Sequence, residues 1–419
     1  MKRYETYKDS GVQWLGDIPQ HWEVRFLSQV ASEYFVSNKN IHHQNLLSLS
    51  YGAIVRKDIN GTDGLLPASF DTYQVVKDGI IVLRLTDLQN DHRSLRVGIA
   101  KEEGIVTSAY TSLQARNTIL PNYLYYQLHT NDIHKVFYSM GDGLRQSLNY
   151  AGLKRLLMVL PPMAEQEGIV AFLDEKTTAI DDLVAKVERE IELLKEFKQA
   201  EIARVVTRGL NPNVPMKPSG IDWIGDIPQH WSIEKVGQNF TERREKVSDK
   251  DYPALSVSKE GVTPQLETAV KTNNGDNRKK VCKGDFVVNS RSDRKGSCGF
   301  SNFDGSVSLI NTVLIPRNNV NGRYYHYVFR SNDFIEEFYR LGRGIVADLW
   351  TTRFTEQRNI MIPIPPIEEQ QGIVDYIDRK TTEIDRLVVE LTYQVEYLRE
   401  YKQRLIADVV TGKINVQQN

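Results

Sequence analysis

With 419 residues, 40% of them hydrophobic and 26% charged, and a formal net charge of −1, the chain has the composition of an ordinary globular protein. Its length predicts two domains or one very large one. The N-terminus lacks the apolar run of a signal peptide and no stretch is long enough to span a membrane, so we expect a cytoplasmic protein. Cys282 and Cys298 are too few for a four-ligand zinc site, and the cytosol disfavours a disulfide.

Two repeated segments divide the chain. The first is GDIPQHW, which stands at 16–22 and again, letter for letter, at 225–231. The second pairs PPMAEQEGIVAFLDEKTTAIDDLV, which begins at Pro161, with PPIEEQQGIVDYIDRKTTEIDRLV, which begins at Pro365. Self-similarity on this scale predicts two copies of one unit, each made of a short lead-in, a variable domain and a long constant segment. We place the boundaries at 1–160, 161–210, 211–362 and 363–419.

The variable domains are predicted to mix helices and strands. Four segments have strand composition: LLSLS, IIVLRLT, DFVVNS and SLINTVLIP. Residues 122–141 and 323–342 have the pattern of amphipathic helices that end at Gly141 and Gly342 in the C-cap position. Short matches such as Asn-Asp and Phe-Tyr at equal spacing show that these domains are diverged copies of each other.

The constant segments are predicted to be long helices. Their apolar residues alternate by 4 and 3, as in Leu173, Thr177, Ile180 and Val184, and sustained spacing of this kind predicts a coiled-coil seam. The Pro-Pro pair before each segment fixes the start of the helix. The natural partner of each stripe is the other copy, in either orientation; two separate arms that bind other proteins are the alternative. The fold class is therefore α+β, with two mixed α/β domains, two long coiled-coil helices and a pseudo-two-fold duplication.

No catalytic motif emerges from the sequence. A GxxxxGK[ST] phosphate loop and the Asn- or Asp-Pro-Pro-aromatic motif of adenine methyltransferases are both missing. The nuclease-like LDEK that begins at Leu173 becomes IDRK in the second copy, and both lie on predicted helices. His42 and His43 are an isolated pair without other metal ligands nearby. The sequence indicates binding rather than catalysis.

The charges point to DNA as the bound molecule. Net charges of +2 for 23–160 and +5 for 232–362 contrast with −4 for each of 161–210 and 363–411. Arg and Lys neutralise phosphates and pair with guanine, and Asn and Gln pair with adenine. The candidates lie in equivalent loops of the two domains, in a basic cluster at 277–280 upstream of the second loop, and in the connectors after 141 and 342. They are Arg84, Gln89, Asn90, Arg93, Arg96, Arg145, Gln146, Lys279, Lys280, Asn289, Arg291, Arg294, Lys295 and Arg343. Solvated polar loops are the alternative interpretation.

Taken together, the twin SGxxWxGDIPxHW lead-ins, the twin PPxxEQxGIV helices and GDFVVNSRSDRKGS make the chain resemble the specificity subunit of type I restriction–modification systems. The resemblance implies that each variable domain reads one half of a bipartite site in double-stranded DNA. It also implies that the helices form an antiparallel coiled coil, which spaces the domains. Two adenine methyltransferase subunits and restriction (translocase) subunits are the implied partners.

The resemblance further implies no catalysis and no cofactor for this chain, since S-adenosylmethionine, ATP and Mg²⁺ belong to the partners. On the acidic helices we expect an exposed face to dock the methyltransferase, with Glu165, Gln166, Glu369 and Gln370 as its candidate residues. Two other functions stay open: a stand-alone restriction enzyme, and a DNA-binding scaffold of a different complex. Activity of the chain alone would favour the first of these.

Overall fold

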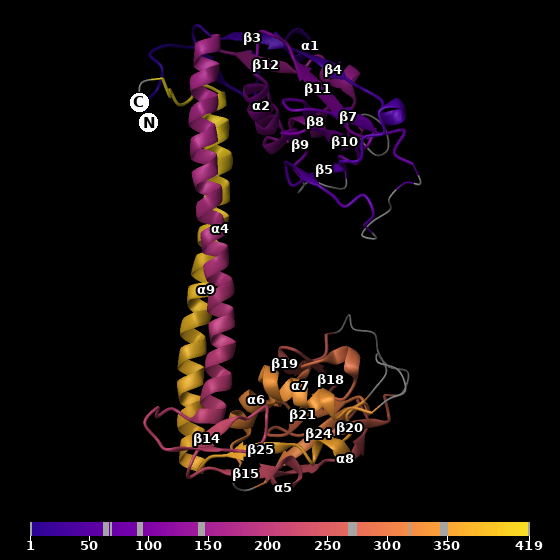
Figure 1. The fold of residues 1–419 in the computed structure, drawn as a ribbon, viewed down its shortest axis with the longest axis vertical. Helices are drawn as coiled ribbons and strands as arrows, with labels where there is room; N and C mark the ends of the chain where they lie inside the picture. The colour runs from indigo at the N-terminus through magenta and orange to yellow at the C-terminus, as the bar shows by residue number, and fades with distance from the viewer. Residues whose placement is uncertain are drawn as a thin grey trace. The chain divides into compact units, whose positions relative to one another are not determined.

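A computed structural model describes residues 2–61, 67, 69–89, 95–140, 147–266, 275–317, 320–343 and 351–417. The chain forms two compact units. The first unit joins Met1–Val187 with Tyr393–Asn419, and the second unit is Glu188–Thr392. Each unit therefore contains one variable domain and parts of both long helices (Figure 1).

The first unit is built on a four-stranded antiparallel sheet in the order β4-β11-β8-β9, with the pairs β1-β2, β3-β12, β5-β6 and β7-β10 around it. Its strands are β1 Tyr7–Asp9, β2 Asp17–Pro19, β3 Glu23–Phe26, β4 Ala31–Tyr34, β5 Leu47–Ser50, β6 Ala53–Arg56, β7 Gln74–Val76, β8 Ile81–Leu83, β9 Val97–Ile99, β10 Gly104–Val106, β11 Thr111–Ala115 and β12 Leu157–Leu160. Its short helices are α1 Leu27–Val30, η1 Asn38–Asn40, α2 Pro121–Ile133, η2 Val136–Ser139 and α3 Tyr150–Leu153.

The second unit repeats this plan with the central sheet β16-β24-β21-β22, the three-stranded sheet β17-β20-β23 and the pairs β13-β14, β15-β25 and β18-β19. Its strands are β13 Met216–Pro218, β14 Asp226–Pro228, β15 Ser232–Lys235, β16 Phe240–Glu242, β17 Lys246–Val247, β18 Leu255–Ser258, β19 Gly261–Pro264, β20 Arg278–Val281, β21 Phe286–Asn289, β22 Cys298–Phe300, β23 Gly305–Val307, β24 Asn311–Pro316 and β25 Met361–Ile364. Its short helices are α5 Val236–Asn239, η3 Ser292–Arg294, α6 Gly322–Arg330, α7 Asn332–Arg340 and α8 Phe354–Gln357.

The register of the central sheets confirms the duplication at the level of single residues. Gly98 lies opposite Val82, and Gly299 lies opposite Val287. Both positions need glycine for the same reason: a Cβ atom would come within 2.6 Å of Leu49 at Gly98 and within 2.9 Å of the backbone of Gly261 at Gly299. In both units, therefore, a β-hairpin packs directly on the edge strand of the central sheet.

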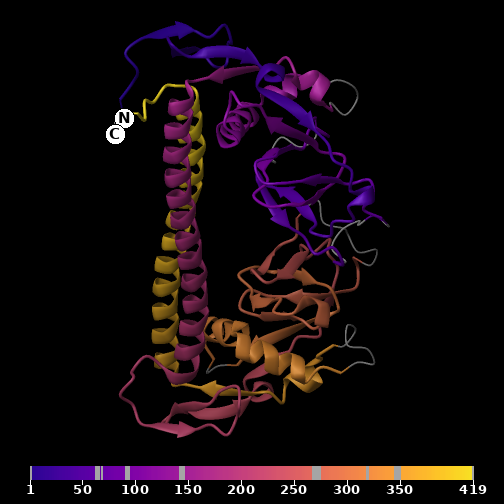
Figure 2. The same ribbon diagram turned by 45° about the horizontal axis from the view of Figure 1, so that its top comes forward.

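Two long helices, α4 (Met163–Arg208) and α9 (Ile367–Val410), pair in opposite directions in each unit. In the first unit Lys402 Nζ lies 2.6 Å from Asp181 Oδ2, and in the second Lys198 Nζ lies 2.6 Å from Asp385 Oδ2. Within each unit, therefore, the two helices run antiparallel: residue numbers increase along α4 in the direction in which they decrease along α9. Figures 1 and 2 show this for the paired stretches of each unit. The predicted seam residues are all buried or half-buried, which confirms the antiparallel coiled coil.

The core of each unit joins its variable domain to the ends of both helices. Trp22, fully buried, packs with α9 residues such as Val409 in the first unit, and Trp231 packs with Val206 of α4 in the second. Lys2, near the N-terminus, forms a β-bridge with Asn415, so the two ends of the chain lie side by side in the first unit. The tryptophan of each GDIPQHW segment therefore anchors that segment in the core of its unit.

Neither predicted amphipathic helix is continuous. In the first unit α2 ends at Ile133, and Lys135 has a left-handed φ of 59° before the short η2 begins. In the second unit Ser331 separates α6 from α7, because its backbone is extended and its hydroxyl accepts a hydrogen bond from the Phe334 N–H. Serine is a preferred N-cap residue, so Ser-Asn-Asp could have indicated this break. The predicted end at Gly342 is confirmed, because α7 ends at Arg340 and Gly342 directly follows its C-cap residue Leu341, while Gly141 lies outside the described residues.

A buried histidine should make the first unit sensitive to acid. His129 of α2 is 6% exposed, and burial, with the nearby charge of Lys402, lowers its pKa from 6.5 to about 4. The unfolded chain therefore binds the proton first, and stability is lost as pH falls from 6.5 towards 4. Between pH 7.5 and 5 we expect urea unfolding of the first unit to lose about 2 kcal/mol. The His129→Gln variant should lose less over the same interval; an equal loss would show that other groups cause it.

Candidate nucleic-acid interface

The predicted DNA-contact loops start at equivalent points of the two central sheets. Asn289 is the last residue of β21, and Arg84 directly follows the equivalent strand β8. The strands around them are alike, since β8 and β21 each lie between a long partner strand and a glycine-containing edge strand. The two units thus share the strand framework but differ in the side chain at this position, which is the guanidinium of Arg84 in the first unit and the amide of Asn289 in the second.

In the second unit, backbone pairing brings two predicted segments together. Arg291 and Arg343 each form a β-bridge with Thr351, so residues 52 positions apart in sequence lie on either side of one residue. The Arg291 carbonyl also accepts a hydrogen bond from the Tyr339 hydroxyl at 3.1 Å, and the Thr352 N–H donates to the Ser290 carbonyl at 3.0 Å. The loop after β21 is therefore held on both sides by elements that come later in the chain.

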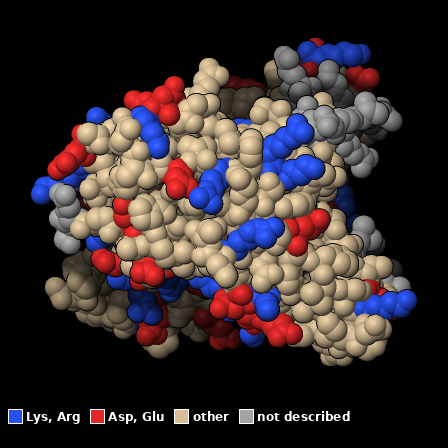
Figure 3. Space-filling view, turned by 90° about the horizontal axis from the view of Figure 1, so that it is seen from above, with Lys and Arg blue, Asp and Glu red and all other residues tan. Residues whose placement is uncertain are grey.

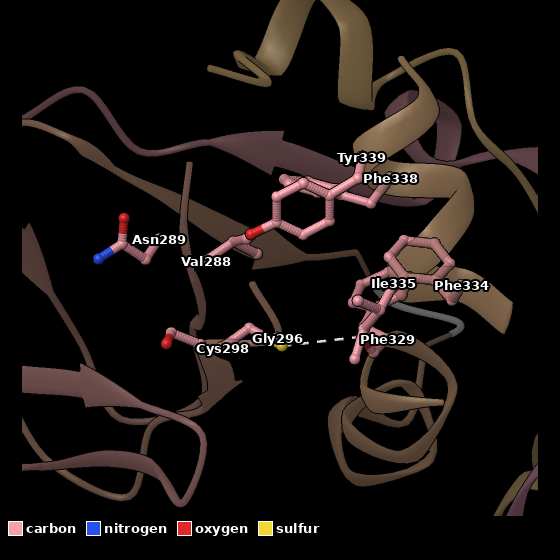
Figure 4. Close-up of a pocket in the computed structure, with 10 residues that line it drawn as sticks. Val288, Asn289, Gly296, Cys298, Phe329, Phe334, Ile335, Phe338 and Tyr339 are labelled. Atoms are coloured by element: carbon pink, nitrogen blue, oxygen red, sulfur yellow. Dashed lines mark hydrogen bonds between the residues drawn. The ribbon is translucent and has the colours of Figure 1, made fainter. Parts of the chain in front are cut away.

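Aromatic residues support this loop from beneath. Figure 4 shows Phe334, Phe338 and Tyr339 of α7 lining a small cavity that also borders Asn289 and the buried Cys298. The cavity measures about 20 Å³, room for a single water molecule. It is a packing feature rather than a ligand site, and Cys298 of β22, whose pKa burial raises to about 12, is part of the core.

The basic side chains of the loop are exposed and only partly neutralised. Arg291 and Arg294 flank the carboxylate of Asp293 at 3.1 and 3.8 Å, and Lys295 lies 2.5 Å from Glu336. Arg343 is the most exposed, at 85% of its side chain, with Glu356 3.8 Å away. Exposed ion pairs of this kind contribute little to stability, so these cations can exchange their partners for phosphates at low cost.

Sequence reasoning missed one exposed arginine of this group. Arg353 stands two residues after Thr351 and precedes the first residue of α8, in the same segment that pairs with Arg291 and Arg343. The signal available was the Thr-Thr-Arg triplet after the predicted connector. We now group Arg291, Arg294, Lys295, Arg343 and Arg353 as the basic loop patch of the second unit.

The side chains of the other basic cluster of the second unit, residues 278–280, all have partners within the unit. Arg278 is 5% exposed and donates through Nε to the Ser306 hydroxyl at 2.8 Å. Lys279 donates to the Asn311 carbonyl at 2.8 Å, and Lys280 lies 2.9 Å from Glu245 with its ammonium over the Tyr252 ring. These residues belong to strand β20, and their partners come from neighbouring strands and loops of the unit. DNA contact by Lys279 and Lys280 stays a prediction, but not from a loose basic loop.

The structure describes only some of the residues of the first unit that were predicted to contact DNA. Arg84 is half-buried and Gln89 is exposed. Arg96 does not reach outward: it is fully buried, and its guanidinium donates to the carbonyls of Arg84, Thr86 and Asp87. The prediction of DNA contact by Arg96 is therefore wrong, because this side chain shapes the loop after β8. The other candidates lie outside the described residues: Asn90, Arg93, Arg145 and Gln146.

The four predicted docking residues serve mainly internal contacts. Glu165 accepts hydrogen bonds from the Trp22 indole at 3.0 Å and lies 2.5 Å from the His21 ring; Glu369 repeats the arrangement with the second tryptophan at 3.0 Å. Gln166 and Gln370 are each 1% exposed, so the prediction that they lie on an exposed helix face is wrong. The side-chain amide of Gln166 accepts a hydrogen bond from the Leu120 N–H and donates one to the Pro161 carbonyl. Gln370 does the same with the Asn321 N–H and the Pro365 carbonyl. Docking by Glu165 and Glu369 stays a prediction.

Charge on the face in view and metal-ligand chemistry among the described residues were compared with this patch. On the face seen in Figure 3, basic and acidic side chains are interspersed among uncharged ones without a single-sign field. Within the described residues, no group of three or more His, Cys, Asp or Glu side chains could hold a metal ion. The described helices also include none that is long and apolar enough to cross a membrane.

Comparisons with known proteins agree with this geometry, although no family model matches the chain. The chain is similar to specificity subunits of type I restriction enzymes, over 96% of its length in one relative and 75% in another. One relative is assigned as the specificity subunit of the MjaX type I restriction enzyme of Methanocaldococcus jannaschii. It is 24% identical over 428 residues, which cover 96% of each chain.

Two solved structures share the fold. A chain from a structure of type I restriction–modification assembly and conformational transition has a TM-score of 0.67 at 15% identity, covering 95% of this chain and 99% of its own. The HsdS subunit from Thermoanaerobacter tengcongensis has a TM-score of 0.54 at 16% identity, covering 95% and 98%. The duplicated two-domain fold with paired long helices is therefore common to all three.

Proposed function

We propose that this chain is the DNA sequence-recognition subunit of a type I restriction–modification complex. Each variable domain reads one half of an asymmetric, bipartite site in double-stranded DNA. One observation carries the proposal: two equivalent sheets end in loops that occupy the same place but present different side chains, Arg84 in one unit and Asn289 in the other. Two readers of unlike half-sites require a common frame with different base-contacting groups.

The chain itself is proposed to be non-catalytic. Its partners are two methyltransferase subunits and restriction subunits, and S-adenosylmethionine, ATP and Mg²⁺ act in those partners. The paired helices set the distance between half-sites: α4 has 46 residues and α9 has 44. At about 1.5 Å per residue each is roughly 65–70 Å long.

The experiment mixes the purified chain with candidate methyltransferase subunits and maps methyladenine in DNA. We expect methylation at one bipartite site only when both components are present. Replacing residues 23–160 with the corresponding domain of another specificity subunit should change one half-site and leave the other. A change in both halves, or methylation by the chain alone, would overturn the proposal. A stable complex that methylates nothing would favour a scaffold role in a different assembly.

Exposed apolar residues support docking at two equivalent places. Leu193 and Phe197 of α4 are 47% and 49% exposed, and their duplicated counterparts on α9, Tyr397 and Tyr401, are 67% and 40% exposed. Large apolar side chains on an otherwise polar helix surface indicate a protein contact. Their repetition in both copies fits two copies of one partner.

Removing one of these side chains tests the docking sites. We expect Tyr397→Ser to weaken methyltransferase binding about tenfold without lowering thermal stability, because a buried aromatic anchor is worth about 1–2 kcal/mol at an interface. Isothermal titration measures the change. Tyr393→Ser is the matched control: Tyr393 is 68% exposed, but its counterpart on α4 is Arg189, so it lacks the repetition. Equal weakening by both variants would argue against a duplicated docking site.

A further inference from the structure

A tyrosine at the tip of a β-hairpin in the first unit is exposed and unpaired. Strands β5 and β6 pair with Ser50 opposite Ala53, so their connection has only two residues, Tyr51 and Gly52. Tyr51 is 84% exposed, and among the described residues its hydroxyl has no hydrogen-bond partner and no other aromatic ring packs on it. Because so little of the ring is removed from water, packing within the unit does not explain why a tyrosine stands there.

The backbone at this tip is also unfavourable for tyrosine. Tyr51 and Gly52 have φ angles of 47° and 83°, and positive φ at both residues of a two-residue hairpin connection defines a type I′ turn. Such turns favour the pair Asn-Gly, because a bulky side chain in the left-handed region costs free energy. A residue kept in an unfavourable conformation without a gain in packing points to a function for its side chain.

The hairpin tip lies beside the predicted DNA-contact loop of the first unit. The loop after β8 rejoins the central sheet at β9, whose first residue is Val97. A Cβ atom on Gly52 would come within 3.1 Å of the Leu95 Cβ atom and 3.6 Å of the Val97 carbonyl oxygen, so the turn is packed against the end of that loop. Because Tyr51 directly precedes Gly52, its exposed ring borders the surface that the loop presents.

The second unit has the same hairpin with a cation at its tip. Strands β18 and β19 pair with Ser258 opposite Gly261, so Lys259 and Glu260 form their connection. Lys259 is therefore the counterpart of Tyr51. It is exposed, and among the described residues no carboxylate lies within ion-pair distance of its ammonium group. An unpaired cation at this position suits phosphate, the charged group that DNA presents.

This second tip also lies where the DNA-contact loop of its unit ends. The loop after β21 rejoins the sheet at Cys298, the first residue of β22. One guanidinium joins the two places, since Arg330 donates to the Cys298 carbonyl at 2.8 Å and also to the Lys259 carbonyl. In both units, therefore, the hairpin tip is held against the point at which the loop returns to the central sheet.

We propose that these hairpin tips are a second DNA-contact element beside each loop, and that the ring of Tyr51 packs against a nucleotide of the first half-site. The inference rests on the proposed function of the chain in DNA recognition. The two tips act differently, because the neutral ring of Tyr51 adds contact area, whereas Lys259 neutralises a phosphate. Contact with DNA accounts for a tyrosine at a turn position that asparagine or glycine would occupy more favourably.

The main variant of the test is Tyr51→Asn, because Asn-Gly is the pair that a type I′ turn prefers. It removes the ring and keeps the hairpin, so urea unfolding of the first unit should show no loss of stability. In the complex with methyltransferase subunits, we expect the affinity for a duplex that carries the mapped site to fall about tenfold, with its salt dependence unchanged. Fluorescence anisotropy at several salt concentrations measures both quantities.

Two further variants give the comparison. Lys259→Ala should weaken binding and also lower the slope of log K against log salt by about 0.9, because it removes one phosphate contact. Tyr393→Ser removes a tyrosine that is 68% exposed on α9, and it should leave DNA affinity unchanged.

The outcomes separate this inference from the function on which it rests. If the unaltered complex binds its site and Tyr51→Asn binds equally well, the inference is overturned and the proposed function stands. A loss of stability in Tyr51→Asn would assign the ring a structural role and would overturn the inference in the same way. If the unaltered complex shows no site-specific binding, the proposed function fails, and this inference fails with it.

Discussion

Replacing Arg291, Arg294 and Arg343 together by alanine is expected to weaken DNA binding about 100- to 1000-fold at moderate salt. These side chains are the exposed cations that the loop after β21 and the Thr351 bridges bring together. Each phosphate contact that is lost should lower the slope of log K against log salt by about 0.9. Fluorescence anisotropy of a duplex that carries the mapped site, measured at several salt concentrations in the methyltransferase complex, gives both quantities.

Two further variants test whether the weaker binding of the triple variant comes from lost phosphate contacts or from its lower net charge. Arg189→Ala removes a cation that is 57% exposed on α4 and paired with Glu192, and it should leave the salt slope unchanged. Asp293→Asn removes the carboxylate between Arg291 and Arg294, and it should strengthen DNA binding because that carboxylate repels phosphate. An unchanged affinity in the triple variant would place the DNA-binding surface elsewhere.

Much of the frame could be predicted because its signals are local or repeated. The 4-3 spacing in α4 and α9 depends only on the sequence of each helix, and the pairing of Asp181 with Lys402 follows once the two copies are placed in opposite directions. The structural role of the two tryptophans could be inferred in the same way, because an identical segment before each variable domain indicates a shared structural role.

The sequence could not show which polar side chains are engaged in internal contacts. Arg96 looks like a free cation in the sequence, but its guanidinium binds carbonyls of the loop that precedes it. Lys279, whose contact with DNA stays a prediction, has a partner in Glu242, 37 positions away. Gln166 looks like a polar helix residue, yet it points towards the backbone at Leu120. Strand register and tertiary packing decide which face such side chains meet, and neither can be derived from composition or spacing.

Replacing Trp231 by alanine is expected to lower the free energy of unfolding of the second unit by about 3–5 kcal/mol, the usual cost of deleting a buried large aromatic side chain. The side chain is 1% exposed and packs among residues of the variable domain and of both long helices. Urea unfolding followed by hydrogen exchange of the second unit measures the loss. The equivalent Trp22→Ala should have the same effect on the first unit.

A conservative variant separates two contributions of Trp231 to the free energy of unfolding: its buried apolar volume and its hydrogen bond. Trp231→Phe keeps most of the apolar volume and removes only the indole N–H, which donates to Glu369 at 3.0 Å; we expect it to cost about 1–2 kcal/mol. Equal losses in the two variants would instead assign the stability to the hydrogen bond with Glu369.

These contacts explain why the GDIPQHW segment is repeated. Its tryptophan and histidine both contact one carboxylate at the start of the following long helix, so each copy of the segment fastens a variable domain to the coiled coil. Because both domains need that attachment while their loops differ, the segment is the same in both units.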